Sequence, residues 1–237
     1  SEVSLTSFLA SPPLKSPLQS LPCGIVGMKL EPIVNLATFH TVGVEVLSLL
    51  SPTLQSEPWF QQLSAEQALA LLQVQCETLK NHLPWHNLFI NLPITLLTEV
   101  DLFHQLLPLP GPGANIEIVE PAQLLSLPCT SRIRAIEHLH LLSGRGCRIW
   151  LDDVDEAQIH GFIDAHLPLS GIKIDKMAFW RLKTTPAFSS LVNLCATLAR
   201  NVLVEGIESQ EYLALARQAG AGFGQGYLWP SVGRRHG

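Results

Sequence analysis

The sequence predicts an α/β fold, a closed (β/α)8 barrel in which strands and helices alternate. Short β-type runs alternate with longer helical patterns along most of the 237 residues, and this alternation is typical of a parallel sheet. About eight such strands in a chain of this length favour a single barrel, with a doubly wound open sheet as the alternative. Apolar residues make up 47% of the chain, which is enough for a core of that size.

The first half of the chain carries the earliest strands after a Pro- and Ser-rich start at 11–24. Such a composition predicts a leader or linker over 1–24, followed by the barrel domain over 25–237. The elements expected next are strands 25–34 and 42–47, helix 56–83, strand 88–92, helix 96–106, a Pro/Gly break at 107–113, strand 116–119 and helix 131–142.

The second half repeats the same rhythm of a short apolar run followed by a helical pattern. The expected elements are strand 148–151, helix 156–165, strand 172–174, helix 187–200, strand 202–204, helix 210–219 and a last strand over 223–228.

Charge and cysteine usage narrow the classes of function. The formal net charge is −5, so the chain has no general field that would attract DNA, and we expect no direct DNA binding. It has no run of 18 or more uncharged apolar residues, so we expect no membrane span in this segment. Five cysteines without a close pair predict reduced thiols. We therefore expect a cytoplasmic protein, or the cytoplasmic domain of a longer one, since the sequence starts without Met.

Nearly every predicted strand carries, near its end, a polar residue that can bind a metal or a phosphate. The set comprises Glu45, Asn91, Glu117, Asp152, Asp153, Lys173, Glu205 and Gln225. Strand ends converge at the mouth of a barrel, where several carboxylates repel one another unless cations lie between them. Oxygen ligands of this kind suit Mg²⁺ or Mn²⁺, and two such ions can clamp a phosphodiester and activate water. Helix capping explains a single acidic residue after a strand, but it does not explain Glu117 or Lys173 within theirs.

Eight short motifs, taken in order, resemble the EAL-domain family of cyclic di-GMP phosphodiesterases. They are EPIVNL at 31–36, EVL at 45–47, INLP at 90–93, IEIVEP at 116–121, IWLDD at 149–153, LPLSGIKID at 167–175, VEGIES at 204–209 and GQGYLWPSV at 224–232. EVL resembles the Glu-Ala-Leu signature, and the whole series spans about residues 28–232. Each motif alone is weak, but eight in the family's order are specific.

The resemblance implies a modified TIM-type (β/α)8 barrel with one antiparallel strand. It also implies hydrolysis of cyclic di-GMP to linear pGpG with two Mg²⁺ or Mn²⁺ ions per site, and a homodimer as the usual family arrangement. The implied metal ligands are Glu45, Asn91, Glu117, Asp152 and Glu205, with Asp153 serving the second metal.

Further roles follow from the same resemblance. The implied catalytic residues are Glu45, Lys173, Glu208 and Gln225. Lys173 would orient or activate the attacking water or stabilise charge on the phosphate, and Gln225 would hold that water. Glu120 and Glu208 would steady the active-site loop and the lysine. The residues expected to contact the substrate are Pro32, Leu47 and Gln225.

Three departures from the family pattern bear on activity. Leu49 stands where the family has an arginine that grips a phosphate, and losing such a contact weakens binding by roughly 1.5–3 kcal/mol. The loop DDVDEAQIH at 152–160 lacks both glycines of the family loop, and Asp155 and Ala157 resist backbone angles that glycine permits. Glu31 replaces a glutamine and adds negative charge.

Two functions are therefore predicted. The first is a phosphodiesterase of reduced activity. The alternative is a weak or inactive EAL domain that acts as a cyclic di-GMP receptor, or binds a partner protein, in motility or biofilm signalling.

Overall fold

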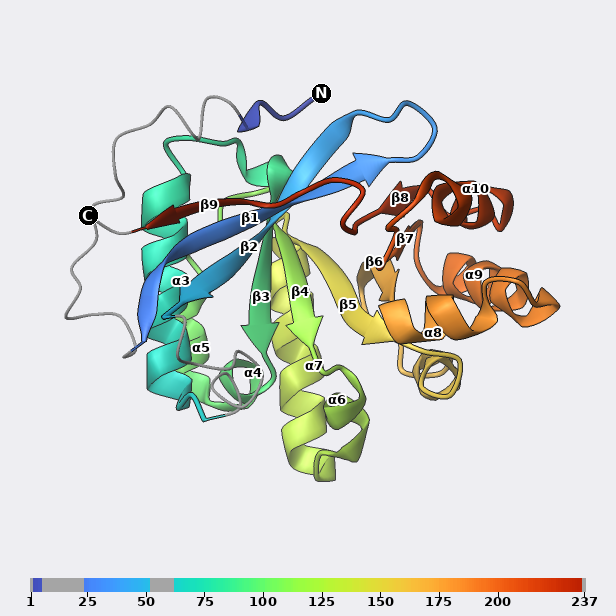
Figure 1. The fold of residues 1–237 in the computed structure, drawn as a ribbon. Helices are drawn as coiled ribbons and strands as arrows, with labels where there is room; N and C mark the ends of the chain where they lie inside the picture. Colours follow the sequence, from blue (N-terminus) through green and yellow to red (C-terminus); the bar gives the residue numbers. More distant parts are fainter. Residues whose placement is uncertain (1, 6–23, 52–61, 236–237) are drawn as a thin grey trace.

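The computed structural model describes residues 2–5, 24–51 and 62–235, and it contains a closed barrel with helices on its outside (Figure 1). Strands follow one another around the barrel from β2 to β8, and β1 (Ile25–Asn35) closes the ring. β1 pairs antiparallel with both β2 (Thr41–Leu50) and β8 (Phe223–Gly224), whereas the other ring neighbours are parallel. The barrel with one antiparallel strand is thus confirmed, and the open-sheet alternative is wrong.

The remaining strands of the ring are short and apolar. They are β3 (Leu88–Pro93), β4 (Asn115–Val119), β5 (Arg148–Val154), β6 (Leu169–Ile174) and β7 (Asn201–Val204). A further strand, β9 (Val232–Arg235), pairs with β1 at residues 27–30, while β8 pairs with β1 at Val34 and Asn35. β8 and β9 therefore lie one after the other along the same edge of β1.

Helices pack around the ring and cover its outer apolar side chains (Figure 1). They are α3 (Ala65–Leu79), α4 (Thr95–Thr98), α5 (Val100–Leu106), α6 (Ala122–Ser126), α7 (Cys129–Gly144), α8 (Lys176–Leu182), α9 (Pro186–Leu198) and α10 (Gln210–Gln218), with 3-10 turns η2 (Trp85–Asn87) and η3 (Ile159–Phe162). Within the described ranges, none of the helices combines the length and the apolar character needed to cross a membrane.

Local chemistry accounts for one boundary that the sequence prediction missed. The helix expected over 56–83 begins at Ala65, because Ser64 and Gln67 form a capping box in which each side chain accepts from the other's backbone N–H. Residues 62–64 and 80–83 are not helical, and the part of that expected helix over 56–61 lies outside the described residues.

Other expected elements differ in length or type. The helix expected over 156–165 is only the short turn η3, and the helix expected over 96–106 is divided into α4 and α5 at Glu99, whose backbone is extended. The last strand stops at Gly224, because the chain then turns at Gly226, where φ is +152°. The division at residue 24 stays a prediction, although Val3 is buried and its N–H donates to the Thr41 carbonyl at 2.8 Å.

A small apolar layer fills the barrel beneath its mouth. It consists of Ile33, Phe89, Trp150 and Leu203, and it is separate from the main core between the sheet and the helices. Phe89 and Trp150 meet edge to face with ring centroids 5.1 Å apart. The Trp150 indole N–H donates to Asn115 Oδ1 at 2.9 Å, so its polar atom is satisfied. This layer forms the floor of the mouth.

We predict that Gly171→Ala destabilises the protein by roughly 1–3 kcal/mol, because Gly171 faces Trp150 across β5 and β6. A Cβ atom at residue 171 would lie 2.3 Å from Trp150 Cε3. Denaturant unfolding monitored by circular dichroism measures the change. The matched control is Gly144→Ala at the end of α7, where a Cβ atom meets nothing within 4 Å and should be neutral or mildly stabilising. Equal effects of the two substitutions would show that the floor is not tightly packed.

Candidate active site at the barrel mouth

A polar layer lies directly above the apolar floor, and both come from the same strands. Side chains of a strand alternate between its faces, so a residue two positions after a floor residue points the same way. Asn91 follows Phe89, Asp152 follows Trp150, and Glu205 follows Leu203 in this manner. The other members are Glu45 on β2, Glu117 on β4, Lys173 on β6 and Gln225 after β8. The expected site residues of seven strands thus meet at one level of the barrel.

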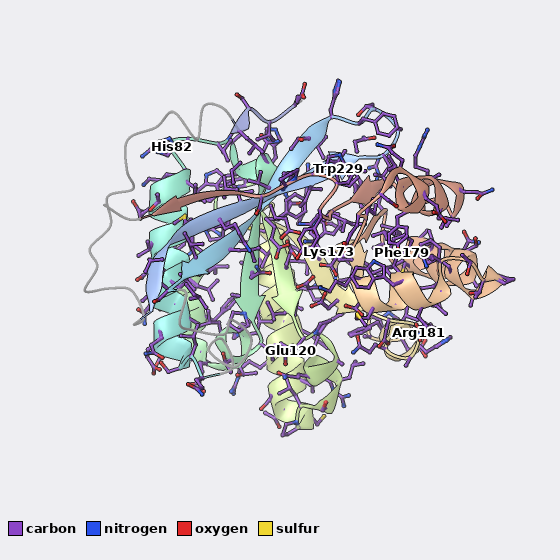
Figure 2. All side chains as sticks on the ribbon, viewed as in Figure 1. His82, Glu120, Lys173, Phe179, Arg181 and Trp229 are labelled. Atoms are coloured by element: carbon purple, nitrogen blue, oxygen red, sulfur yellow. The ribbon has the colours of Figure 1, made fainter. Side chains whose placement is uncertain are left out.

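Lys173 is the centre of this layer and is fully buried inside the barrel (Figure 2). Its Nζ lies 2.9 Å from Glu45 Oε1 and 2.8 Å from Glu117 Oε1, and it donates to Gln225 Oε1 at 2.6 Å. Gln225 Nε2 donates in turn to Glu45 Oε1 at 3.1 Å, and Asn91 Nδ2 donates to Glu45 Oε2 at 3.0 Å. The ammonium group thus donates hydrogen bonds to Glu45 and Gln225 and forms an additional ion pair with Glu117.

The charges of this layer perturb one another strongly. Burial alone would lower the pKa of Lys173, but the negative charges of Glu117 and Glu45 outweigh it and hold that pKa well above its usual value. For Glu45, burial opposes ionisation, but the Lys173 charge and the hydrogen bonds around it lower the pKa. Lys173 and Glu45 thus form a charged pair at neutral pH.

The pKa values of the remaining carboxyl groups are raised, because these groups are buried close to other negative charges. Burial, followed by the Glu45 charge, raises the pKa of Glu117 well above its usual value. Burial also raises the pKa of Asp152, to about 7, with the Glu45 and Asp153 charges acting in the same direction. Burial and the two neighbouring aspartates raise the pKa of Glu205. One lysine is therefore too little positive charge for this set of acids.

Two groups of three carboxylates could each hold a metal ion. The first contains Glu45, Glu117 and Asp152, and the second contains Asp152, Asp153 and Glu205, with oxygens within 4.8 Å of one another in each group. Four buried oxygens of this site lack a hydrogen-bond partner in the described part of the chain, and they are Asn91 Oδ1, Glu117 Oε1, Glu117 Oε2 and Glu205 Oε2. Of these, Glu117 Oε1 still forms the ion pair with Lys173. A hard divalent cation suits such all-oxygen donors and would relieve their repulsion. The residues present therefore fit the expected metal chemistry.

The second group depends on an irregularity in β5. The pairing of β5 with β6 breaks between Leu151 and Val154, which leaves Asp152 and Asp153 in a bulge. Asp153 has φ +47°, and its N–H donates to Asp152 Oδ1 at 3.0 Å. Asp153 is exposed whereas Asp152 is buried, so the bulge turns one carboxylate inward and one toward the opening.

The loop after this bulge does not have the backbone conflict expected from its missing glycines. Neither Asp155 nor Ala157 has a positive φ, so that expectation is wrong. Asp155 Oδ1 instead accepts from the N–H groups of Ala157 at 3.0 Å and Gln158 at 2.8 Å. An aspartate that caps its own turn replaces the conformational freedom of glycine here.

Several predicted site residues lie outside the polar layer, and their roles stay predictions. Glu120 is exposed, has φ +49°, and accepts a hydrogen bond from Gln123. Glu208 lines a hollow of about 250 Å³ beside Trp180, Ser209 and Tyr212.

The expected substrate contacts on β1 and β2 differ in direction. Leu47 is half-buried and pairs with Lys29. Pro32 is buried opposite Val44, one residue out of step with Glu31, so it faces away from the polar layer. Glu31 itself pairs with Glu45, and burial followed by the Glu45 charge raises its pKa.

Sequence reasoning missed the contacts that hold the loops of the mouth. Arg181 on α8 pairs with Glu156 in the loop after β5, and the Trp180 indole N–H donates to the Gly206 carbonyl at 2.8 Å. Each contact joins residues about 25 positions apart, and no local pattern signals such pairs.

Comparison with known proteins identifies a matching family and relatives of this chain. The family model "EAL domain" matches residues 24–231. Cyclic di-GMP phosphodiesterase RocR of Pseudomonas aeruginosa is 34% identical over 140 residues, which cover 56% of this chain and 32% of RocR. Probable cyclic di-GMP phosphodiesterase PdeB of Escherichia coli K12 is 28% identical over 226 residues, covering 84% of this chain and 41% of PdeB. The chain thus spans less than half the length of these curated relatives.

Solved structures share the fold. The manganese and cyclic di-GMP complex of Klebsiella pneumoniae BlrP1 superposes with a TM-score of 0.68 at 22% identity, over 96% of this chain and 61% of that one.

We predict that the metal-free protein loses stability as pH rises from about 4 to about 7. The folded-state pKa of Asp152 is raised from 3.8 to about 7, so its protonated form stabilises the fold below pH 3.8 and this contribution is lost as pH rises through 7. Glu117 and Glu205 act in the same direction. Thermal unfolding in EDTA measures the slope. Asp152→Asn should flatten it, and an unchanged slope in that variant would contradict the account.

Proposed function

The chain belongs to the EAL domain family, and from that premise we propose that it is a metal-dependent phosphodiesterase that opens cyclic di-GMP to linear pGpG with reduced activity. The observation that carries this proposal is the pair of carboxylate groups that share Asp152 above the buried Lys173. RocR is named a cyclic di-GMP phosphodiesterase and PdeB a probable one, and these two relatives support the choice of substrate.

The metal-binding roles follow from the two groups. Glu45, Glu117 and Asp152, with Asn91 beside Glu45, would hold one Mg²⁺ or Mn²⁺ ion. Asp152, Asp153 and Glu205 would hold a second. Two divalent cations, when bound, supply Lewis acidity and lower the pKa of water next to a phosphodiester.

The protein's own residues stabilise charge on the phosphate and orient the Glu45 carboxylate. Lys173 is a fixed positive charge inside a site with little water, and such a charge stabilises the negative charge that accumulates on a phosphate during displacement. Gln225 fixes the direction of the ammonium group by accepting its hydrogen bond, and its own amide N–H holds Glu45 in place. The bonds of Asn91 and Gln225 to Glu45 fix the rotamer of that carboxylate before ligand arrives.

The proposal of reduced activity rests on two residues near the mouth, Leu49 and Glu31. Leu49 is half-buried and pairs with Gly27, which has no side chain, so neither residue of this pair supplies a cation for a substrate phosphate. Glu31 adds a carboxyl group next to Glu45 on the same face of the ribbon. Both features weaken binding of an anionic ligand.

A second candidate is a receptor that binds cyclic di-GMP without turnover, or a domain that binds a partner protein, because the loop at 154–160 keeps its turn through Asp155 but differs in sequence from the family loop. The four described cysteines are free thiols, which supports a cytoplasmic location for either function.

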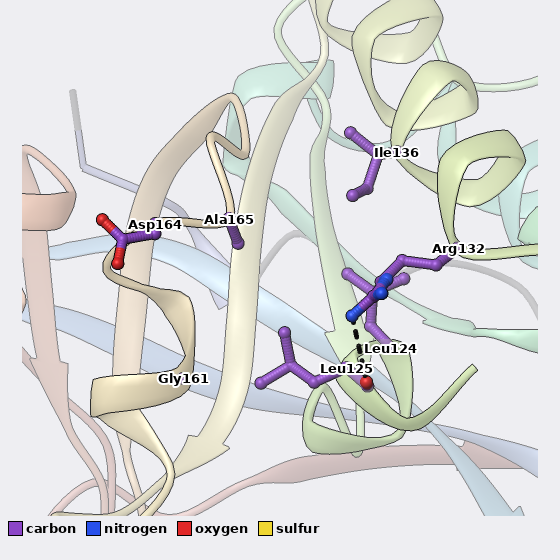
Figure 3. A pocket seen from close by; sticks show the side chains of 7 residues that line it. All are labelled: Leu124, Leu125, Arg132, Ile136, Gly161, Asp164 and Ala165. Carbon is purple, nitrogen blue, oxygen red and sulfur yellow. Dashed lines mark hydrogen bonds between the residues drawn. The ribbon is translucent and has the colours of Figure 1, made fainter. Parts of the chain in front are cut away.

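A homodimer is proposed through the face between α7 and η3, where a hollow of about 270 Å³ opens (Figure 3). Leu125 and Ile136 line it, and Arg132 and Asp164 stand on its two sides. One cation and one anion on an apolar patch are self-complementary under two-fold symmetry. Sedimentation should give a dimer for the native protein and a monomer for Ile136→Asp. A native monomer at micromolar concentration would overturn this interface.

We expect cyclic di-GMP hydrolysis with Mn²⁺, and a loss of roughly 100-fold or more in Glu45→Ala, since even residues that only support metal ligands cost 10–100-fold. Glu137→Ala, an exposed position on α7, is the matched control and should retain full activity. Product analysis by chromatography measures pGpG.

Equally negligible rates in the native protein and Glu45→Ala would rule out the enzyme. Calorimetry with cyclic di-GMP and Ca²⁺ would then separate the two alternatives, because heat of binding indicates the receptor and its absence leaves the partner-protein role.

A further inference from the structure

Helix α8 touches both loops that carry the second carboxylate group. Asp152 and Asp153 lie in the bulge before the β5 loop, and Glu205 opens the loop after β7. α8 follows β6, the strand between them, and lies beside the C-terminal end of β5 (Figure 1). β5 and β7 each pair with β6, so β6 and α8 connect the two loops in addition to the direct contacts of Asp152 and Asp153 with Glu205.

The β5 loop is fastened to α8 at two points. Asp175 caps α8, its Oδ2 accepting from the Ala178 N–H, and its own N–H donates to the Val154 carbonyl at 2.9 Å. One turn further along α8, Arg181 forms an ion pair with Glu156. Arg181 lies on the outer side of the helix (Figure 2), with 52% of its side chain exposed. The bulge that contains Asp153 is thus followed directly by a segment held to α8.

The β7 loop is fastened to the same helix. The Trp180 indole N–H donates to the Gly206 carbonyl at 2.8 Å, one residue after Glu205. Gly206 has φ +84°, and a Cβ atom there would lie 2.6 Å from Lys176 Cβ, so the loop approaches α8 as closely as glycine allows. Adjacent residues 180 and 181 therefore hold the two sides of one carboxylate group.

Backbone strain makes this bracing necessary. Asp153 has φ +47°, a conformation that costs a non-glycine residue free energy and persists only when its surroundings hold it. The ion pair is too exposed to contribute much to folding. Its consequence is local: it restricts the loop that sets the direction of Asp153.

Resting on the proposed function, we propose that α8 positions the second metal group, with Arg181 acting through Glu156 on Asp153 and Trp180 acting through Gly206 on Glu205. In the first group, Glu45 and Glu117 are held by Lys173, and Glu45 also by Asn91. The shared Asp152 lies within β5, before the loop fastened to α8, so we expect this group to depend less on the helix.

The test uses Mn²⁺ alone, titrated into the whole chain and followed by electron paramagnetic resonance, so it needs no turnover. Arg181→Glu and Glu156→Arg should each weaken the weaker of two Mn²⁺ sites by about tenfold and leave the stronger within about twofold. The double variant, which restores the ion pair with reversed charges, should recover the weaker site to within about threefold.

Trp180→Phe tests the other loop. It keeps an aromatic ring beside Lys176 but removes the N–H donor to Gly206, and it should weaken the same site by about tenfold. Arg145→Glu is the control, because Arg145 is exposed and precedes β5 at the end of the barrel away from the mouth. It should change neither Mn²⁺ site.

The inference is overturned if the Arg181 and Glu156 variants leave the weaker site unchanged, weaken both sites equally, or are not rescued by the double variant. An unchanged site in Trp180→Phe overturns the β7 half. Fewer than two Mn²⁺ ions bound by the native protein would overturn the two-metal proposal itself, and that result is visible before any variant is made.

Discussion

The buried ammonium group of Lys173 is the interaction on which the barrel mouth depends. It lies within 3 Å of oxygens from Glu45, Glu117 and Gln225, which come from three different strands. Removing a partner from such a pair leaves a buried charge without compensation, and this costs several kcal/mol. The lysine therefore keeps the strands' polar ends together when no cation is present, and its single charge leaves the acids only partly neutralised.

That partial neutralisation connects the architecture to the chemistry. Burial holds Glu117, Asp152 and Glu205 above their usual pKa values, which is a free-energy cost that a folded protein tolerates mainly at functional sites. A divalent cation between two of these carboxylates removes the cost and is the simplest reason for the arrangement. The floor of Phe89 and Trp150 is apolar and buried, so it does not solvate the carboxylates from beneath, and their attraction for a cation is stronger than in bulk water.

The sequence was informative wherever position along a strand determines direction. A polar residue two places after an apolar one on successive strands, as in Phe89–Asn91 and Trp150–Asp152, predicts a polar layer above an apolar floor. The sequence could not predict contacts between loops, because the pairing of Glu156 with Arg181 joins residues 25 positions apart and depends on where α8 packs. The backbone conflict expected from the missing glycines is absent, because the side chain of Asp155 caps its own turn. Family membership supports the proposed substrate, which no residue pattern identifies by itself.

Crystals grown with Mn²⁺ and examined by anomalous diffraction test the central claim most directly. The account predicts two manganese peaks on either side of Asp152, one against Glu45 and Glu117 and the other against Asp153 and Glu205. A single peak away from Asp152, or no peak with Lys173 still bridging Glu45 and Glu117, would contradict it.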